Sequence, residues 1–250
     1  DFSAYSDIAR GLARLMGFEL MVNFRLPYFA ATPAEFWSRW HISLSEWLRD
    51  YIFFPLRRAL LRWKGSPGRL AALIVPPLVT MLVSGIWHGT GWNFILWGLY
   101  HAVLLILFQL FVKERPVSSE NEVGIVGKQT LGNIISFVQR ILAGGARIFL
   151  MFGLVWLGWL IFRSATPDQL WYFLTHLSLK SSPETSALWA NLVLYSLPVV
   201  VVQILQQLRG DLLVLARLPV ALRIVIYAAA LGLIVVLGVR QTSEFIYVQF

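Results

Sequence analysis

Long apolar stretches recur along the chain, and each is close to the ~20 residues that a helix needs to cross a bilayer. They lie at residues 70–87, 93–112, 148–162, 188–205 and 220–239. Most polar and charged residues fall between these stretches, as is typical of the loops that join membrane-spanning helices. The pattern therefore predicts an all-α polytopic membrane protein, with about five spans in this chain.

The first predicted span and the turn that follows it contain residues that disturb a regular helix. Pro76 and Pro77 lie inside the first span, where their missing N–H groups should bend or break the helix. Gly89 and Gly91 follow that span and should turn the chain into the next one. Residues 70–112 are therefore predicted to form a helix pair around a turn that begins at His88.

A helix of a different kind is predicted over residues 33–54. Thr32-Pro33-Ala34-Glu35 has the sequence of a helix start, with a capping threonine, a proline in the first turn and a glutamate for a capping box. One face of this helix is polar and the other is aromatic, with His41 at the border. The polar face has Arg39, Ser43, Glu46 and Asp50, and the aromatic face includes Trp37, Trp40, Leu44 and Tyr51. Such a motif helix is expected at the membrane interface or in a re-entrant position.

Composition and charge support the membrane assignment. Hydrophobic residues make up 58% of the chain and charged residues 14%, whereas soluble proteins are nearer to one half and one quarter. The net charge is +8, but the basic residues cluster in loops at 57–69, 113–128 and 209–217. Under the positive-inside rule these loops are cytoplasmic, and no nucleic-acid binding is predicted. The chain has no cysteine, which excludes thiolate metal sites and a thiol nucleophile.

Four histidines are the best candidates for chemistry: His41, His88, His101 and His176. His88 lies in GIWHGTGW, where glycines allow close approach and tryptophans form an apolar wall. Such surroundings favour a neutral imidazole that can accept a proton, so a catalytic and a structural role both remain open. Local features alone favour a structural role for His41. His101 is expected to be buried against other helices, and His176 to end a short surface helix.

No metal site is predicted from the histidines. His41 and His88 are 47 residues apart, a spacing that matches no metal-ligand motif. No carboxylate or thiol is spaced to complete a ligand set with them. The sequence also lacks a nucleophile elbow, a phosphate-binding loop and a dinucleotide fingerprint.

Two runs together resemble the membrane-bound O-acyltransferase (MBOAT) family: EFWSRWHISLSEWLRDYIFFPL and SGIWHGTGWNFILWGLYH. The more specific similarity is to its bacterial alginate O-acetylation group. DFSAYSDIARGLARLMGFEL, WLGWLIFRSATPDQLWYFL and the ending FIYVQF extend the resemblance over essentially the whole chain. It implies a ring of transmembrane and re-entrant helices around a central cavity. Because the family is longer, residues 1–250 are expected to be a single C-terminal portion of such a domain, without its N-terminal spans.

The resemblance also implies an activity. An enzyme of this group is expected to move an acetyl group from a cytoplasmic thioester towards hydroxyls of an exported polysaccharide such as alginate. Acetyl-CoA or another acyl thioester would be the donor, and no tightly bound cofactor is implied. His88 is expected to act as general base, and His41 to orient the donor or bind the developing oxyanion. The expected location is the bacterial inner (plasma) membrane, with lipid, the polysaccharide acceptor and periplasmic or membrane-anchored acetyltransferases as partners.

Several assignments remain open at this stage. The candidates for a dry wall or for donor binding are Trp40, Trp87, Trp92, Asn93 and Arg39. For Asn93, the alternative is a purely structural role. For Arg39, the alternative is contact with lipid headgroups. For the whole chain, the alternatives are D-alanyl or other acyl transfer to a cell-wall polymer, a transporter with a histidine proton path, and an inactive membrane fragment.

Overall fold

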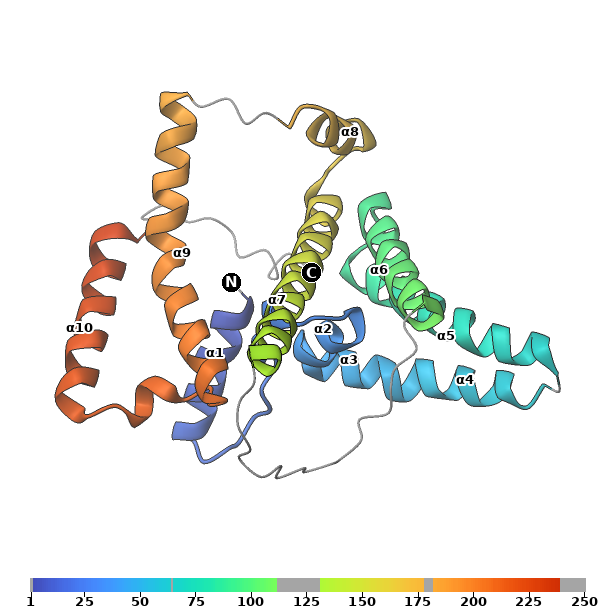
Figure 1. Ribbon diagram of the computed structural model, residues 1–250, viewed down its shortest axis with the longest axis horizontal. Coiled ribbons are helices and arrows are strands. Elements are labelled where there is room, and N and C mark those ends of the chain that lie inside the picture. Colours follow the sequence, from blue (N-terminus) through green and yellow to red (C-terminus); the bar gives the residue numbers. More distant parts are fainter. Residues whose placement is uncertain (1, 64, 112–130, 178–181, 239–250) are drawn as a thin grey trace. The chain divides into compact units, whose positions relative to one another are not determined.

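The computed structural model describes residues 2–63, 65–111, 131–177 and 182–238, and these ranges contain helices and no strand. The chain divides into two compact units, one formed by residues 27–177 and the other by residues 1–26 and 178–250 (Figure 1). The predicted basic loop at 113–128 and the last residue of the predicted fifth span lie outside the described residues.

The membrane-spanning character predicted from the sequence is confirmed for four helices. By length and composition, the segments Ser66–His88, Trp92–Phe111, Ala143–Arg163 and Thr185–Arg209 can each cross a bilayer. The fifth predicted span corresponds to a shorter apolar helix, Val220–Val236. The chain is thus an all-helical, multi-pass membrane protein. The ring of helices around a central cavity stays a prediction.

The unit formed by residues 27–177 contains both of the motifs that the sequence singled out. Its helices are α2 (Pro33–Arg39), α3 (Ile42–Leu48), η2 (Arg49–Phe53, a π-helical turn), α4 (Phe54–Leu61), α5 (Ser66–His88), α6 (Trp92–Phe111), α7 (Leu131–Arg163) and α8 (Pro167–Thr175), preceded by the 3-10 turn η1 (Pro27–Phe29). Its core consists of Ala30, Phe36, Met151 and Val155, with aromatic residues of α2 and α7 packed against them. The core therefore fastens α2 to the middle of α7.

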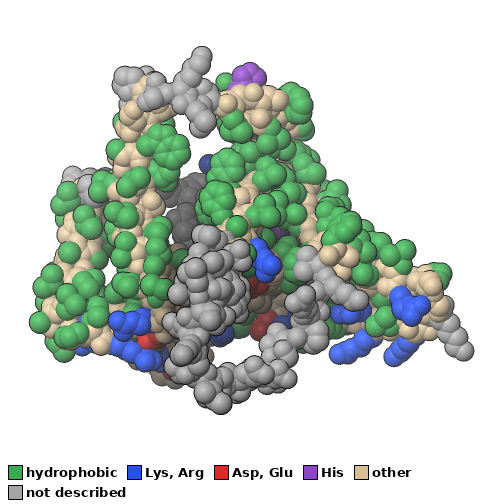
Figure 2. Space-filling view, viewed as in Figure 1, with side chains coloured by type: hydrophobic (Ala, Val, Ile, Leu, Met, Phe, Trp, Pro, Cys, Tyr) green, Lys and Arg blue, Asp and Glu red, His purple; other side chains and the backbone are tan. Residues whose placement is uncertain are grey.

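The second unit contains α1 (Phe2–Leu15), α9 (Pro183–Arg209), the 3-10 turn η3 (Val214–Arg217) and α10 (Val220–Leu237). α9 begins with a reciprocal capping box between Ser182 and Thr185 and continues through Pro198. Its most apolar window has no buried residue, so its side chains suit a hydrocarbon environment. In Figure 2, hydrophobic side chains cover the α9 surface that faces the viewer.

The helix predicted over residues 33–54 is divided in the structure. Its start is confirmed, because the Thr32 hydroxyl accepts a hydrogen bond from the Glu35 N–H at 3.1 Å. The helix then ends at Arg39, because Trp40 is extended and His41 adopts left-handed angles of φ 42° and ψ 55°. A break of this kind resets the helical register, so the predicted polar and aromatic faces do not continue across it. Whether the segment is interfacial or re-entrant stays a prediction.

The α5–α6 pair is confirmed, but the two prolines do not break α5. Pro76 and Pro77 are both fully buried within one continuous helix of 23 residues. The two helices approach closely at Gly85 and Gly98, where a Cβ atom would collide with the backbone carbonyl of Phe94 or of Met81. Small residues at such contacts are the usual means of close helix packing in membranes. This packing fixes where the end of α5 meets the start of α6.

Candidate functional site

His88 is the last residue of α5, at the turn where the sequence predicted it. The next residue, Gly89, has φ 145° and donates its N–H to the Ile86 carbonyl at 3.0 Å. A Cβ atom on Gly89 would lie 2.6 Å from a ring carbon of Phe94, so both the backbone angle and the available space require glycine. The glycine thus ends α5 and lets α6 begin directly beside His88.

Aromatic rings surround the His88 side chain, which is only 7% exposed. Its ring centroid lies 4.8 Å from that of Trp87, 5.3 Å from Trp97 and 5.1 Å from Phe162, and all three contacts are edge-to-face. Phe94 is next, at 6.4 Å. These rings come from α5, α6 and α7. These rings leave the imidazole little contact with solvent, and an imidazole in its neutral form can act as a general base.

His41 reaches the same place from the junction between α2 and α3. Its ring contacts the Trp87 indole edge-to-face, with centroids 5.7 Å apart. Trp87 therefore contacts both histidines that the sequence singled out. Burial lowers the pKa of His41 to about 4, although a backbone hydrogen bond partly opposes this shift. The side chain is consequently neutral near pH 7.

The left-handed backbone of His41 is one of two such cases among the described non-glycine residues, the other being Leu26. This conformation costs free energy and persists only where the surroundings enforce it. Here the extended Trp40 enforces it from one side, since its ring is stacked on Phe36 with centroids 5.7 Å apart. From the other side, α3 begins directly after His41, and the Ser45 N–H binds the His41 carbonyl at 2.9 Å.

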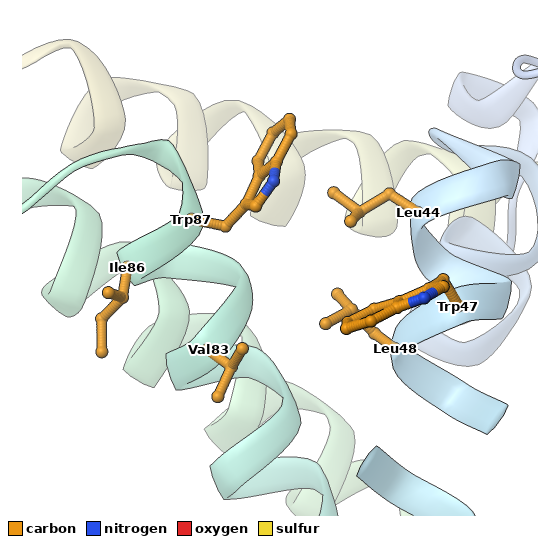
Figure 3. A pocket seen from close by; sticks show the side chains of 6 residues that line it. All are labelled: Leu44, Trp47, Leu48, Val83, Ile86 and Trp87. Carbon is orange, nitrogen blue, oxygen red and sulfur yellow. The ribbon is translucent and has the colours of Figure 1, made fainter. Parts of the chain in front are cut away.

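An apolar pocket of about 400 Å³ lies between α3 and α5 and is lined in part by Trp87. Its lining residues are Leu44, Trp47, Leu48, Val83, Ile86 and Trp87. Figure 3 shows the side chains of α3 and α5 on opposite sides of the pocket, with Trp87 and Leu44 directed towards its interior. Trp87 thus belongs both to the histidine pair and to the pocket. The pocket can hold an apolar group against Trp87, the residue that both histidines contact.

The side-chain N–H groups of Trp92 and Asn93 donate hydrogen bonds to backbone carbonyls in α7 and directly after it. The Nδ2 group of Asn93 donates to the Phe162 carbonyl at 2.7 Å. The Trp92 indole donates to the Ala165 carbonyl at 3.0 Å. Both residues therefore fasten the start of α6 to the end of α7, which also positions Phe162 against His88. For Asn93, the structure supplies the structural role that the sequence left open.

Trp40 and Arg39 lie one and two residues before His41, and both have partners within the same unit. Trp40 packs against Trp159 of α7, with centroids 4.8 Å apart, and both rings lie against the core. Arg39 forms an ion pair with Glu35 one turn earlier. The other carboxylate oxygen of Glu35 accepts the Ala31 N–H at 2.7 Å. A contact of Arg39 with donor phosphate or with lipid stays a prediction.

The remaining histidines, and Phe162 near His88, differ in how well the sequence predicted their positions. His101 was expected to be buried against other helices, which is confirmed, since it is 1% exposed. Phe162 contacts His88 from α7, 74 positions further along the chain, and nothing in its local sequence marks it. Only the pairing of α6 with α7 brings it there. His176 follows α8, on the surface, as predicted.

These features define a class: a multi-pass helical membrane protein in which two histidines contact one tryptophan that also lines an apolar pocket. Residues 1–119, which include both histidines, match the model of the MBOAT, membrane-bound O-acyltransferase family. The chain is also 40% identical over 164 residues to the probable alginate O-acetylase AlgI of Pseudomonas syringae pv. tomato. The chain belongs to the membrane-bound O-acyltransferase family.

Other relatives are named for acyl transfer to different polymers. The chain is 30% identical over 172 residues to the teichoic acid D-alanyltransferase of Streptococcus thermophilus, which is 69% of this chain and 40% of that protein. It is 38% identical over 113 residues to the peptidoglycan O-acetyltransferase of Helicobacter pylori, which is 44% of this chain and 20% of that protein. The match to the alginate O-acetylase covers 66% of this chain and 26% of that protein. The chain thus spans about a quarter of the length of that relative.

Proposed function

We propose that this chain contributes the catalytic histidines of a membrane-bound O-acyltransferase that acetylates hydroxyl groups of an exported polysaccharide. The observation that carries the proposal is the contact of His41 and His88 with the same Trp87 indole, beside an apolar pocket. Similarity to alginate O-acetylases over two thirds of the chain supports acetyl as the acyl group and an alginate-like acceptor. The proposal includes the bacterial inner membrane as the location and periplasmic or membrane-anchored acetyltransferases as partners.

The proposed step transfers the acyl group from the thioester sulfur to the hydroxyl oxygen, and no atom changes its oxidation state. The acceptor hydroxyl attacks the thioester carbonyl of acetyl-CoA or another acyl thioester, and its proton passes to His88. The C–S bond then breaks, the new C–O ester bond remains, and His88 returns the proton to the leaving thiolate. His41, neutral near pH 7, orients the thioester or donates a hydrogen bond to the oxyanion. The aromatic rings keep bulk water from hydrolysing the donor.

D-alanyl transfer to a wall polymer is the second candidate. It is favoured by two relatives named teichoic acid D-alanyltransferase, which are 30% and 35% identical to this chain. The same histidines would serve, because an alanyl thioester presents the same carbonyl and the same leaving group. The two functions differ in the polar amine of the donor. The lining of the pocket described above is apolar, which suits an acetyl group better than an ammonium group.

The test is acyl transfer by the protein in membranes, with labelled acetyl-CoA and an alginate oligosaccharide as acceptor. Wild-type membranes should acetylate the oligosaccharide, and His88→Ala should lower the rate about 10²–10⁴-fold, the usual contribution of a general base. His176→Ala is the matched control, because this histidine is exposed and follows α8. The control variant should keep the wild-type rate.

Three results would contradict the proposal. Full acetylation by His88→Ala would exclude His88 as the general base. Equal losses in His88→Ala and His176→Ala would show a general effect of substitution. Transfer from a D-alanyl thioester but not from acetyl-CoA would show that the function is D-alanyl transfer and not acetylation.

A further inference from the structure

Behind His88, three buried ring nitrogens have no hydrogen-bond partner among the described residues. They are the indole Nε1 atoms of Trp37 and Trp97 and the Nδ1 atom of His101. Trp97 and His101 are each 1% exposed. A buried polar atom without a partner costs free energy, and most such atoms in proteins bind a protein group or an ordered water. Three of them in one place call for a common explanation.

The three rings contact one another. The centroid distances are 5.7 Å between Trp37 and Trp97, 5.2 Å between Trp37 and His101, and 4.9 Å between Trp97 and His101. All three contacts are edge-to-face. Phe36 closes one side, because its ring stacks on His101 at an interplanar angle of 7°. Gly158 closes another, since a Cβ atom there would lie 2.8 Å from His101 Nε2. The three rings thus form one cluster of mutual contacts, and each ring carries one of the three unpartnered nitrogens.

The chemistry of the three nitrogens matches a single hydroxyl oxygen. An indole N–H only donates, whereas a neutral imidazole carries one donor nitrogen and one acceptor nitrogen. An oxygen that accepts from both indoles and donates its own hydrogen to His101 Nδ1 makes three hydrogen bonds. That number is typical of a buried water, which binds to groups that would otherwise be unsatisfied. A charged ligand is disfavoured, because the enclosing groups are uncharged aromatic rings.

We propose that Trp37, Trp97 and His101 form a binding site for one hydroxyl oxygen, supplied by water or by an alcohol group of the acceptor. Through Trp97, whose ring also contacts His88 at 5.3 Å, the bound hydroxyl fixes the inner side of the candidate active site. The site does not depend on acyl transfer, since its occupancy affects the stability of the fold in any case. It gives a role to His101, a buried histidine that the proposed reaction does not use.

The test replaces the N–H donor without changing the shape of the ring. Incorporation of 3-benzothienylalanine at Trp97 or at Trp37 puts sulfur in place of the indole N–H. If the N–H binds a hydroxyl, each replacement should lower the melting temperature of the purified protein by roughly 2–4 °C. If the N–H is unpaired, the replacement removes a buried unsatisfied donor, so the melting temperature should stay unchanged or rise. The direction of the shift therefore decides the question.

Two other tryptophans supply the controls. Trp92 donates to the Ala165 carbonyl, so the same replacement there must lower the melting temperature. Trp156 is 52% exposed on α7, so replacement there should have little effect. Melting is measured with and without an alginate oligosaccharide. A fall in both conditions identifies water, and a fall only with the oligosaccharide identifies the acceptor hydroxyl. No fall at Trp97 and Trp37 in either condition, with the Trp92 control responding, would overturn the proposal. Absence of acetyl transfer would overturn the proposed function alone.

Discussion

At the scale of single residues, His41 differs most from its sequence context. No glycine, asparagine or proline marks residues 40–41, yet His41 adopts a left-handed backbone conformation. The structure explains it by packing: Trp40 is held in the aromatic core, so the chain must turn sharply before α3 begins. The turn brings the His41 imidazole to Trp87. Strain at this position thus accompanies the placement of a candidate catalytic group.

The pKa of His41 leads to a prediction about stability and pH. Because the folded pKa is lowered from 6.5 to about 4, the unfolded chain binds protons first as the pH falls. Stability should therefore decrease between pH 6.5 and pH 4 and should level off below that. We expect a loss of roughly 1 kcal/mol at pH 5, less than the full shift would give because the side chain keeps some contact with solvent.

The comparison of the wild type with His41→Gln measures this contribution. Glutamine does not titrate, so the difference in unfolding free energy between the two proteins should change between pH 7 and pH 5. A constant difference over this range would show that His41 is not held neutral by burial.

Both histidines could be singled out from the sequence as candidates, but many of their contacts could not be predicted. Family resemblance named His41 and His88, and the glycines around residue 88 indicated a turn. Nothing in the sequence shows that the Asn93 amide and the Trp92 indole bind backbone carbonyls at the end of α7. Those contacts depend on how two helices meet, which a local pattern does not encode.

At the scale of helices, the apolar stretches predicted the positions of the spans, but the sequence did not predict where a helix breaks. The double proline was expected to bend or break α5; the helix is not broken, since it continues through Pro76 and Pro77, while a bend stays a prediction. In membrane helices, neighbouring groups can satisfy the carbonyls that a proline leaves free. The break that does occur follows Arg39, where the sequence predicted a continuous helix. It results from tertiary packing of Trp40, which outweighs local helix propensity.

Glycines of α7 give a prediction about helix packing. A Cβ atom at Gly158 would lie 2.8 Å from His101 Nε2, and the buried imidazole has little room to move. Gly158→Ala should therefore destabilise the protein by about 1–3 kcal/mol, the usual cost of overpacking. Gly153, on the same helix, has no atom within 4 Å of its Cβ position. Gly153→Ala should be neutral or slightly stabilising.

Melting of the two alanine variants in the same detergent tests this difference. Equal melting temperatures for Gly158→Ala and Gly153→Ala would show that α7 does not press on His101. A drop confined to Gly158→Ala would support the packing described here.

At the scale of the whole molecule, the prediction of a multi-pass helical protein is confirmed, while its orientation in the membrane stays a prediction. α5 has 23 residues and a length of about 34 Å, enough to cross a hydrocarbon core of about 30 Å. The exposed Arg62 precedes it and the exposed Thr90 follows it. The basic residues near Arg62 predict a cytoplasmic position for that end under the positive-inside rule.

The absence of cysteine makes this topology directly measurable. Single substitutions Arg62→Cys and Thr90→Cys should react with a membrane-impermeant maleimide from opposite sides. In intact cells from which the outer membrane has been removed, only Thr90→Cys should be labelled. In inverted vesicles only Arg62→Cys should be labelled. Labelling of both positions from one side would show that α5 does not cross the membrane.

The central claim is that His41 and His88 act together in one acyl-transfer site around Trp87. The most direct measurement is the rate of acetyl-thioester cleavage by the wild type, His41→Ala, His88→Ala and the double variant in proteoliposomes. If the histidines form one unit, the double variant should be no slower than His88→Ala, which itself should lose about 10²–10⁴-fold. A double variant whose loss equals the product of the two single losses, or a His88→Ala protein with the wild-type rate, would contradict the account.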